Sequence, residues 1–138
     1  MTTAYDLMVA PNGARLTKAD HPALPMTAIE IANTAVACAA AGATVRDEAG
    51  RHSLDPQRYA QTIETIRARS DIRIQISTEA AGMFDVAMQR TCLANTTAQD
   101  ASVSIREMAR DPDGMADTYN SAVKSGISIQ HILYDSSD

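Results

Sequence analysis

The sequence lacks the residues that usually mark membrane-spanning, secreted or nucleic-acid-binding proteins. Its 138 residues include no tryptophan, one phenylalanine and two cysteines, and the net charge is −5. No nucleic-acid interface is expected, because no basic stripe interleaved with aromatic residues is present. The longest nearly apolar run, residues 35–43, is too short to cross a membrane. Residues 1–7 have no basic residue before an apolar core, unlike a secretory signal.

The composition indicates one ordinary soluble domain over residues 1–138. The chain is 45% hydrophobic and 21% charged, as expected for a globular protein with a real core. Cys38 and Cys92 both fall within predicted helices, which favours buried free thiols in a reducing compartment. We therefore expect a cytoplasmic protein.

A strand between two helices is predicted near the middle of the chain, over residues 71–82. Ile72, Ile74 and Ile76 alternate with polar residues, which is the period of a strand with one buried face. A strand flanked by helices belongs to a βαβ unit, so the sheet is expected to be parallel. The C-terminal end of such a strand, here residues 77–79, is where α/β proteins build their sites.

Further βα units are predicted on both sides of this strand, with strands starting near residues 5, 43, 71, 101 and 127. A first helix opens with a capping box from Thr27 to Glu30 and is expected to end at Gly42 as its C′ residue. A second helix starts after the N-cap Asp55, a third near Asp85, and a fourth spans residues 115–125. Side chains expected to face the core are Ile29, Ala32, Val36, Tyr59, Ile63, Ile66, Val86, Met88, Leu93, Met115, Tyr119 and Val123.

The spacing of the units predicts an α/β fold, a partial (β/α)8 TIM barrel of about four and a half units that is incomplete at the C-terminus. The second strand is expected to be shortened, because only residues 43–45 separate the first helix from the charged turn at residues 46–48, and a strand needs about five residues. A five-stranded flavodoxin-like sheet is the alternative architecture. A glycine-rich phosphate loop and a final helix, which that alternative requires, are not found in the sequence.

Polar residues are expected to gather where the parallel strands end. The set comprises Asn12, Arg15, Arg46, Asp47, Glu48, Ser77, Thr78, Glu79, Arg106, Glu107, Tyr134, Asp135 and Ser136. Arginine binds carboxylates in a bidentate manner and a carboxylate can act as a general base, so the set suits a small anionic molecule. The alternative is that these are solvated loop charges. Of the histidines, His21 and His52 are predicted in loops and His131 in the core side of the last strand, and none has the spacing of a zinc motif.

Four segments of the sequence resemble the β-keto acid cleavage enzymes, a family that includes the 3-keto-5-aminohexanoate cleavage enzyme. They are VAPNGARLTKADHPALPMT (residues 9–27), VRDEAGRHSLDP (45–56), IQISTEA (74–80) and QHILYD (130–135). The resemblance implies a zinc-dependent (β/α)8 barrel, usually a homo-oligomer. Such enzymes convert a β-keto acid and acetyl-CoA into acetoacetate and a new CoA thioester, with zinc polarising the keto acid.

The resemblance also implies roles for individual residues. Ser77 matches a serine that lies in the substrate site, and Asp135 matches an acidic residue that takes part in the chemistry, so both are expected to be catalytic. Arg15 matches a position expected to select the end-group of the substrate. The substrate is then expected to contact Asn12, Arg15, Arg46, Asp47, Thr78, Glu79, Arg106 and Glu107.

Two departures from the family pattern limit what this chain is expected to do. The family carries a His-x-His pair of zinc ligands in its second strand, and these would fall between Thr44 and Val45. The resemblance also does not extend to the C-terminal half of the family, which carries a third zinc ligand. We therefore expect the chain to bind no zinc and to be inactive alone. The alternatives are a non-catalytic half-barrel that self-associates and a five-stranded module that binds a phosphorylated ligand.

Overall fold

The computed structural model describes residues 10–38, 41–43 and 45–136, and it contains a parallel sheet covered by helices. The sheet has the strand order β1-β4-β5-β6, formed by Ala41–Ala43, Ile74–Ser77, Asp100–Ser104 and Ser128–Ile132. All three strand pairings are parallel. The α/β class with a parallel sheet is therefore confirmed, while the first predicted strand, over residues 5–10, lies outside the described residues except for Ala10.

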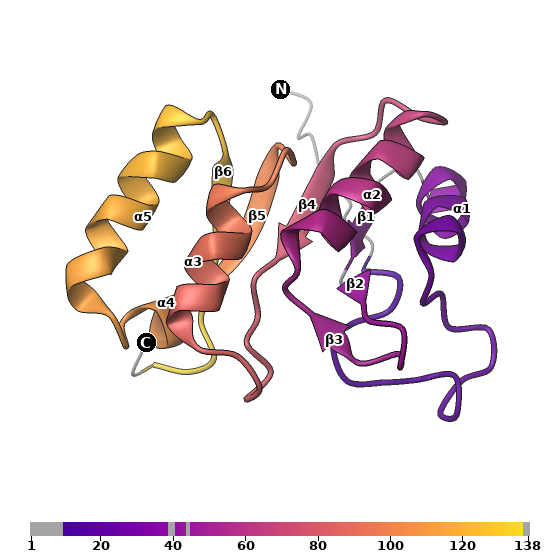
Figure 1. Cartoon of the computed structure of the whole chain (residues 1–138), viewed down its shortest axis with the longest axis horizontal. Coiled ribbons are helices and arrows are strands. Elements are labelled where there is room, and N and C mark those ends of the chain that lie inside the picture. Colours follow the sequence, from indigo (N-terminus) through magenta and orange to yellow (C-terminus); the bar gives the residue numbers. More distant parts are fainter. Residues whose placement is uncertain (1–9, 39–40, 44, 137–138) are drawn as a thin grey trace, which may run out of the picture.

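The helices alternate with the strands of the sheet along the chain and pack along one face of the sheet (Figure 1). They are α1 (Ala28–Cys38), α2 (Pro56–Arg67), α3 (Val86–Ala94), the single turn α4 (Ile105–Met108) and α5 (Pro112–Lys124). A short antiparallel hairpin, β2 (Val45–Arg46) with β3 (His52–Ser53), precedes α2. Within the described part of the chain, no helix is long and apolar enough to span a membrane.

The predicted helix starts are confirmed by their caps. The Thr27 hydroxyl accepts from the amide of Glu30 at 3.2 Å, and the Glu30 carboxylate accepts from the amide of Thr27 at 2.9 Å, which is a complete capping box. Asp55 caps α2 through the amide of Gln57 at 2.9 Å. Asp85 caps α3 in the same way, so side chains next to the helices define where they begin.

The strand order decides between the two predicted architectures. In a flavodoxin-like sheet the first strand lies between the second and the third. Here β1 corresponds to the predicted second strand and β4 to the predicted third. The two pair directly, with Gly42 opposite Gln75. The flavodoxin-like order is therefore excluded.

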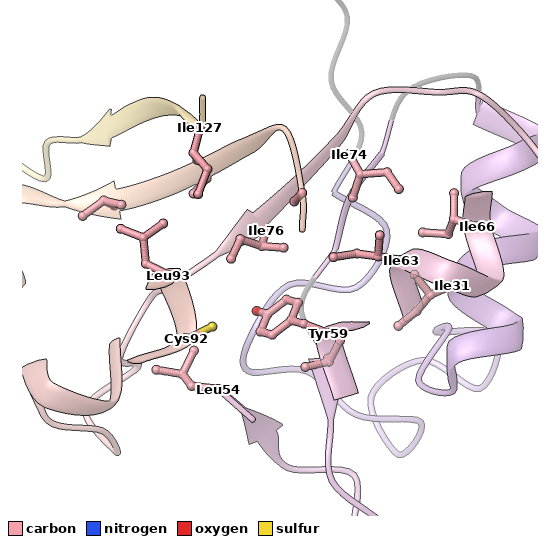
Figure 2. Packing of buried hydrophobic residues seen from close by; sticks show 14 of the residues in the cluster. Ile31, Leu54, Tyr59, Ile63, Ile66, Ile74, Ile76, Cys92, Leu93 and Ile127 are labelled. Carbon is pink, nitrogen blue, oxygen red and sulfur yellow. The ribbon is translucent and has the colours of Figure 1, made fainter. Parts of the chain in front are cut away.

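The two faces of the sheet differ in polarity. Ile74, Ile76 and Val103 point to the helices and are buried in the cluster shown in Figure 2. The opposite face carries polar pairs that cross the strands: Arg73 binds Asp100 at 2.5 and 2.7 Å, and Gln75 donates to Gln130 at 2.8 Å, across β5. The hydrophobic core thus lies on the helix side.

Some residues predicted to face the core are exposed instead. Met88 is 46% exposed and Val123 is 72% exposed, whereas the polar Gln89 and Thr118 on the same helices are buried. The predicted core positions of α2 and Leu93 of α3 are confirmed as buried. At Met88 and Val123 the prediction is wrong, because hydrogen-bonded polar side chains on the same helices, Gln89 and Thr118, face inward instead. In α1, Ala32 is buried as predicted, whereas Ile29 and Val36 are exposed and Ile31 and Ala35 are buried in their place.

Two boundaries and the burial of one histidine also differ from the prediction, in which the fourth strand covers residues 101–105. Gly42 lies in β1 and does not terminate α1. Ile105 belongs to α4, because Ser104 ends β5 and caps the helical turn through the amide of Glu107 at 3.2 Å. His131 was predicted in the core but is exposed, since β6 is the outer strand of the described sheet; its ring meets Tyr119 edge-on at 5.4 Å.

The buried face of α3 can be tested with two substitutions on that helix. We expect Leu93→Ala to lower the free energy of unfolding by about 2–5 kcal/mol, because Leu93 is 1% exposed and its removal leaves a cavity. Met88→Ala is expected to change it by less than about 0.5 kcal/mol. Urea denaturation of both variants measures the difference, and equal losses would mean that Met88 packs inward.

Candidate functional site

Charged side chains from four segments meet near the C-terminal ends of the strands. Arg15 approaches Glu79, which follows β4, with 3.4 Å between guanidinium and carboxylate. Arg106, which follows β5, binds Asp135, which follows β6, at 2.7 Å. The guanidinium of Arg106 also lies over the ring of Tyr134, 5.5 Å from its centre. These five residues form what we call the strand-end site.

Tyr134 lies near both ion pairs of the strand-end site. Partial burial raises the pKa of its phenol, and the carboxylates of Glu107 and Glu79 raise it further. A hydrogen bond with Ser104 and the charge of Arg15 oppose this rise. Because its ordinary value is already 10.0, Tyr134 stays protonated at neutral pH and can act as a hydrogen-bond donor.

The backbone of residues 77–80, where β4 leaves the sheet, is held by four side chains from four different elements. Tyr59 in α2 donates to the carbonyl of Ser77 at 2.6 Å. Gln89 in α3 donates to the carbonyl of Thr78 at 2.7 Å. His52 in β3 lies 2.7 Å from the carbonyl of Glu79, and Glu107 in α4 accepts from the amide of Ala80 at 2.9 Å. The positions of Ser77 and Glu79 therefore depend on all four elements.

Two residues predicted to contact substrate, Glu107 and Thr78, instead hold the backbone near the end of β4. Glu107 is 7% exposed, and its carboxylate accepts from Gln89 at 2.6 Å as well as from Ala80. Thr78 is fully buried, and its hydroxyl donates to the carbonyl of Ser102 at 3.0 Å. Both side chains shape the loop behind the strand-end site.

Three further predicted residues also lie apart from the strand-end site. Arg46 is buried and donates to backbone carbonyls of the N-terminal loop, including Gly13 at 2.6 Å and Leu16 at 2.9 Å. Asn12 is buried and donates to the carbonyl of Pro25 at 3.1 Å. Asp47 accepts from Arg51 within its own turn at 2.8 Å. By contrast, Ser77 is half-buried at the end of β4, and its hydroxyl accepts from the amide of Glu79 at 3.3 Å.

His52 was predicted in a loop, but it lies in β3 and is buried. Because a carbonyl only accepts, the ring nitrogen Nε2 that faces Glu79 carries the proton, and Nδ1 has no partner. Phe84 packs against the ring edge-on at 5.4 Å. Neither the contact of His52 with Glu79 nor the hydrogen bond from Tyr59 to Ser77 has a local sequence signal, since the partners are 27 and 18 residues apart.

Sequence comparisons agree with the resemblance. The model of the family described as beta-keto acid cleavage enzyme matches residues 6–138. A 3-keto-5-aminohexanoate cleavage enzyme from Fusobacterium nucleatum subsp. nucleatum is 41% identical over 81 residues. This alignment covers 54% of the chain and 30% of the relative, so the matched part of the chain spans less than a third of the length of that enzyme.

The scaffold role of Glu107 predicts a large effect on stability. We expect Glu107→Ala to lower the free energy of unfolding by about 2–4 kcal/mol, because the amide of Ala80 and the side chain of Gln89 would be left buried without their acceptor. Hydrogen exchange of the Ala80 amide should become faster. Glu64→Ala, on the exposed face of α2, is the control and should change stability by less than about 0.5 kcal/mol. Equal effects of the two substitutions would rule out this role.

Proposed function

The chain belongs to the β-keto acid cleavage enzyme family, and we propose that it carries the part of such an enzyme that recognises the keto acid. The proposed parent reaction takes a β-keto acid and acetyl-CoA and yields acetoacetate and a new CoA thioester. The strand-end site is the single observation that supports this role. It places the guanidinium group of Arg15 beside Glu79 and that of Arg106 beside Tyr134 and Asp135, at the edge of a parallel sheet where α/β enzymes bind ligands.

Both ion pairs of the strand-end site are accessible enough to exchange their partners. The Arg15 side chain is 79% exposed and that of Arg106 is 42% exposed. Ion pairs at such exposure contribute only about 0–1 kcal/mol, so a substrate carboxylate can replace Glu79 or Asp135 at little cost. Once Asp135 is released, its carboxylate is proposed to act as the general base, while Ser77 and the Tyr134 hydroxyl hold the oxygens of the keto acid.

Zinc is proposed to be absent from this chain. When bound in the family, the metal supplies Lewis-acid polarisation of the keto group. Structural and catalytic zinc sites need at least three protein ligands, and the described residues contain no group of three His, Cys, Asp or Glu side chains that could hold a metal ion. His52 cannot contribute readily, since its Nε2 is committed to a backbone carbonyl. The donor set does not fit, and we propose that the chain alone does not cleave keto acids.

The proposed fold is part of a (β/α)8 barrel. The sequential strand order and the helices on one face support it, because a barrel winds in one direction with its helices outside. In this arrangement the polar face with Arg73, Gln75 and Gln130 would line the barrel interior. We further propose a cytoplasmic homo-oligomer.

Recognition of the keto acid can be tested with acetoacetate as the probe. We expect NMR shifts of the Ser77, Glu79 and Tyr134 amides on titration. Arg106→Gln should weaken binding about tenfold, which corresponds to about 1.4 kcal/mol, because the bidentate partner of the carboxylate is lost. Arg110→Gln, an exposed arginine beyond α4, should bind as the parent chain does.

Two results would contradict this proposal. Shifts that avoid the strand ends, or an unchanged affinity in Arg106→Gln, would exclude the strand-end site as the recognition site. One zinc per chain after dialysis, measured by mass spectrometry, would contradict the proposed absence of the metal, as would cleavage that depends on acetyl-CoA.

A second candidate is a non-catalytic half-barrel that self-associates. The outer strand β6 supports it, because Leu133 directly after it is 61% exposed and Tyr134 is 47% exposed, and an uncovered strand edge favours pairing with another chain. We expect sedimentation velocity at micromolar concentration to show a dimer or larger species. Leu133→Lys should shift the distribution toward the monomer, whereas a parent chain that stays monomeric would exclude this candidate.

A further inference from the structure

The hairpin formed by β2 and β3 lies between the N-terminal loop and the segment that follows β4 (Figure 1). Arg46 and His52 are directly opposite each other in its two strands. Both are buried, Arg46 with 7% and His52 with 3% of its surface exposed. Side chains of directly opposite residues in an antiparallel pair lie on the same face, about 4.5–5.5 Å apart at Cβ. The two residues therefore form one unit within the hairpin.

Arg46 holds the N-terminal loop on either side of Arg15. Its Nη2 donates to the carbonyl of Gly13 at 2.6 Å and to that of Leu16 at 2.9 Å. Its Nη1 donates to the carbonyl of Gly50 in the hairpin turn at 3.1 Å, so the guanidinium is fixed to the hairpin while it binds the loop. The backbone that carries Arg15 is therefore tied to β2.

Close packing does not replace this support on the side of the loop that faces α1. A cavity of about 670 Å³ lies there, between residues 17–19, the start of α1, the hairpin turn and α2, and Arg46 lines it. We call it the cavity beside α1. Because no protein atoms fill this space, the loop depends on hydrogen bonds to keep its position next to the hairpin.

His52 holds the other member of the exposed ion pair of the strand-end site. Its Nε2 lies 2.7 Å from the carbonyl of Glu79, to which it donates, and Phe84 packs edge-on against the ring. The carboxylate of Glu79 is 3.4 Å from the guanidinium of Arg15. One cross-strand pair thus fixes the backbone on both sides of this contact, at Arg15 through Arg46 and at Glu79 through His52.

Each member of the cross-strand pair also has a buried nitrogen without a hydrogen-bond partner among the described residues. These atoms are Nε of Arg46 and Nδ1 of His52. A buried polar atom without a partner costs free energy, and an apolar pair would hold the two strands together without that cost. Such unsatisfied groups are expected where the position of a residue serves function and not stability alone.

The contact between Arg15 and Glu79 is loose. Its length of 3.4 Å exceeds the length of about 2.7–2.9 Å that charge-assisted hydrogen bonds usually have, and the Arg15 side chain is 79% exposed. A carboxylate from solution can therefore replace Glu79 without breaking a strong bond. Because the hairpin holds both backbones, Arg15 keeps its place during this exchange, and less ordering is needed when a ligand binds.

We propose that Arg46 and His52 are positioning residues for recognition of the keto acid. The hairpin holds Arg15 and Glu79 at the separation at which the carboxylate of the substrate can exchange with that of Glu79. Neither Arg46 nor His52 touches the substrate. This inference rests on the proposed function, because it requires that Arg15 meets the keto acid.

The test titrates the full 138-residue chain and its variants with acetoacetate, followed by NMR. Arg46→Lys keeps the charge but loses the fork of donors that holds Gly13, Leu16 and Gly50, so it should weaken binding about tenfold. Arg51→Gln is the matched control, because Arg51 belongs to the same hairpin but its side chain is 74% exposed. It should leave the affinity unchanged.

Two substitutions of His52 differ only in the reach of their amide group. His52→Gln can place its amide nitrogen near the position of Nε2 and donate to Glu79, so it should bind acetoacetate within about twofold of the parent chain. His52→Asn is one methylene shorter and cannot reach the carbonyl of Glu79, so it should weaken binding about tenfold. Both variants place a neutral amide in the same buried site, so a general loss of stability would affect them alike.

A second readout needs no keto acid. In the ligand-free variants, we expect the amides of Arg15 and Leu16 to shift in Arg46→Lys, and those of Glu79 and Ala80 to shift in His52→Asn. Urea denaturation of each variant gives its folded fraction, since a loss of stability alone does not change the affinity of the folded protein.

The possible failures are distinguishable. If the parent chain, Arg46→Lys and His52→Asn bind acetoacetate equally, the positioning role is overturned while the proposed function stands. If His52→Gln binds as weakly as His52→Asn, the Nε2 donor has no such role. If the parent chain itself does not bind acetoacetate, the proposed function is overturned, and this inference with it.

Discussion

After β4 the chain leaves the sheet in the protein interior. The strand-end site depends on which groups form hydrogen bonds with the peptide amides and carbonyls of that segment. Buried backbone amides and carbonyls need hydrogen-bond partners, and here Tyr59, Gln89, His52 and Glu107 supply them for residues 77–80. Each partner comes from a different element, so the loop has its shape only when α2, α3, α4 and the hairpin are all in place. The geometry of the site is therefore a consequence of the packing of the whole chain.

The same requirement explains why some charged residues at the strand ends face inward. Hydrogen bonds that involve an ionised group are stronger than neutral ones, so a carboxylate such as Glu107 is an effective acceptor for a buried amide. Arg46 is the cationic counterpart, since it donates to carbonyls of the loop that precedes α1. Charges at the ends of the strands thus divide into an inner group that holds loops and an outer group, with Arg15, Arg106 and Asp135, that can meet a ligand.

This division marks the limit of what the sequence predicts. The capping box at Thr27 and the caps at Asp55 and Asp85 follow from local patterns, because the interacting residues are neighbours in the chain. The parallel sheet follows from the alternation of strand and helix patterns along the sequence. The inward direction of Glu107 depends on Ala80, which is 27 residues away, and no local pattern encodes it. The buried faces of α3 and α5 were mispredicted at Met88 and Val123 for a related reason. Hydrophobicity alone ranks methionine above glutamine, but the hydrogen bonds of Gln89 make its burial favourable.

The strand-end site and the cavity beside α1 share one structural element, the loop that carries Arg15. Arg46 lines the cavity and donates to the carbonyls of Gly13 and Leu16, on either side of Arg15. The position of the backbone at Arg15 therefore depends on the buried guanidinium of Arg46. The contact between Arg15 and Glu79 is exposed and 3.4 Å long, so less than about 1 kcal/mol is needed to displace it.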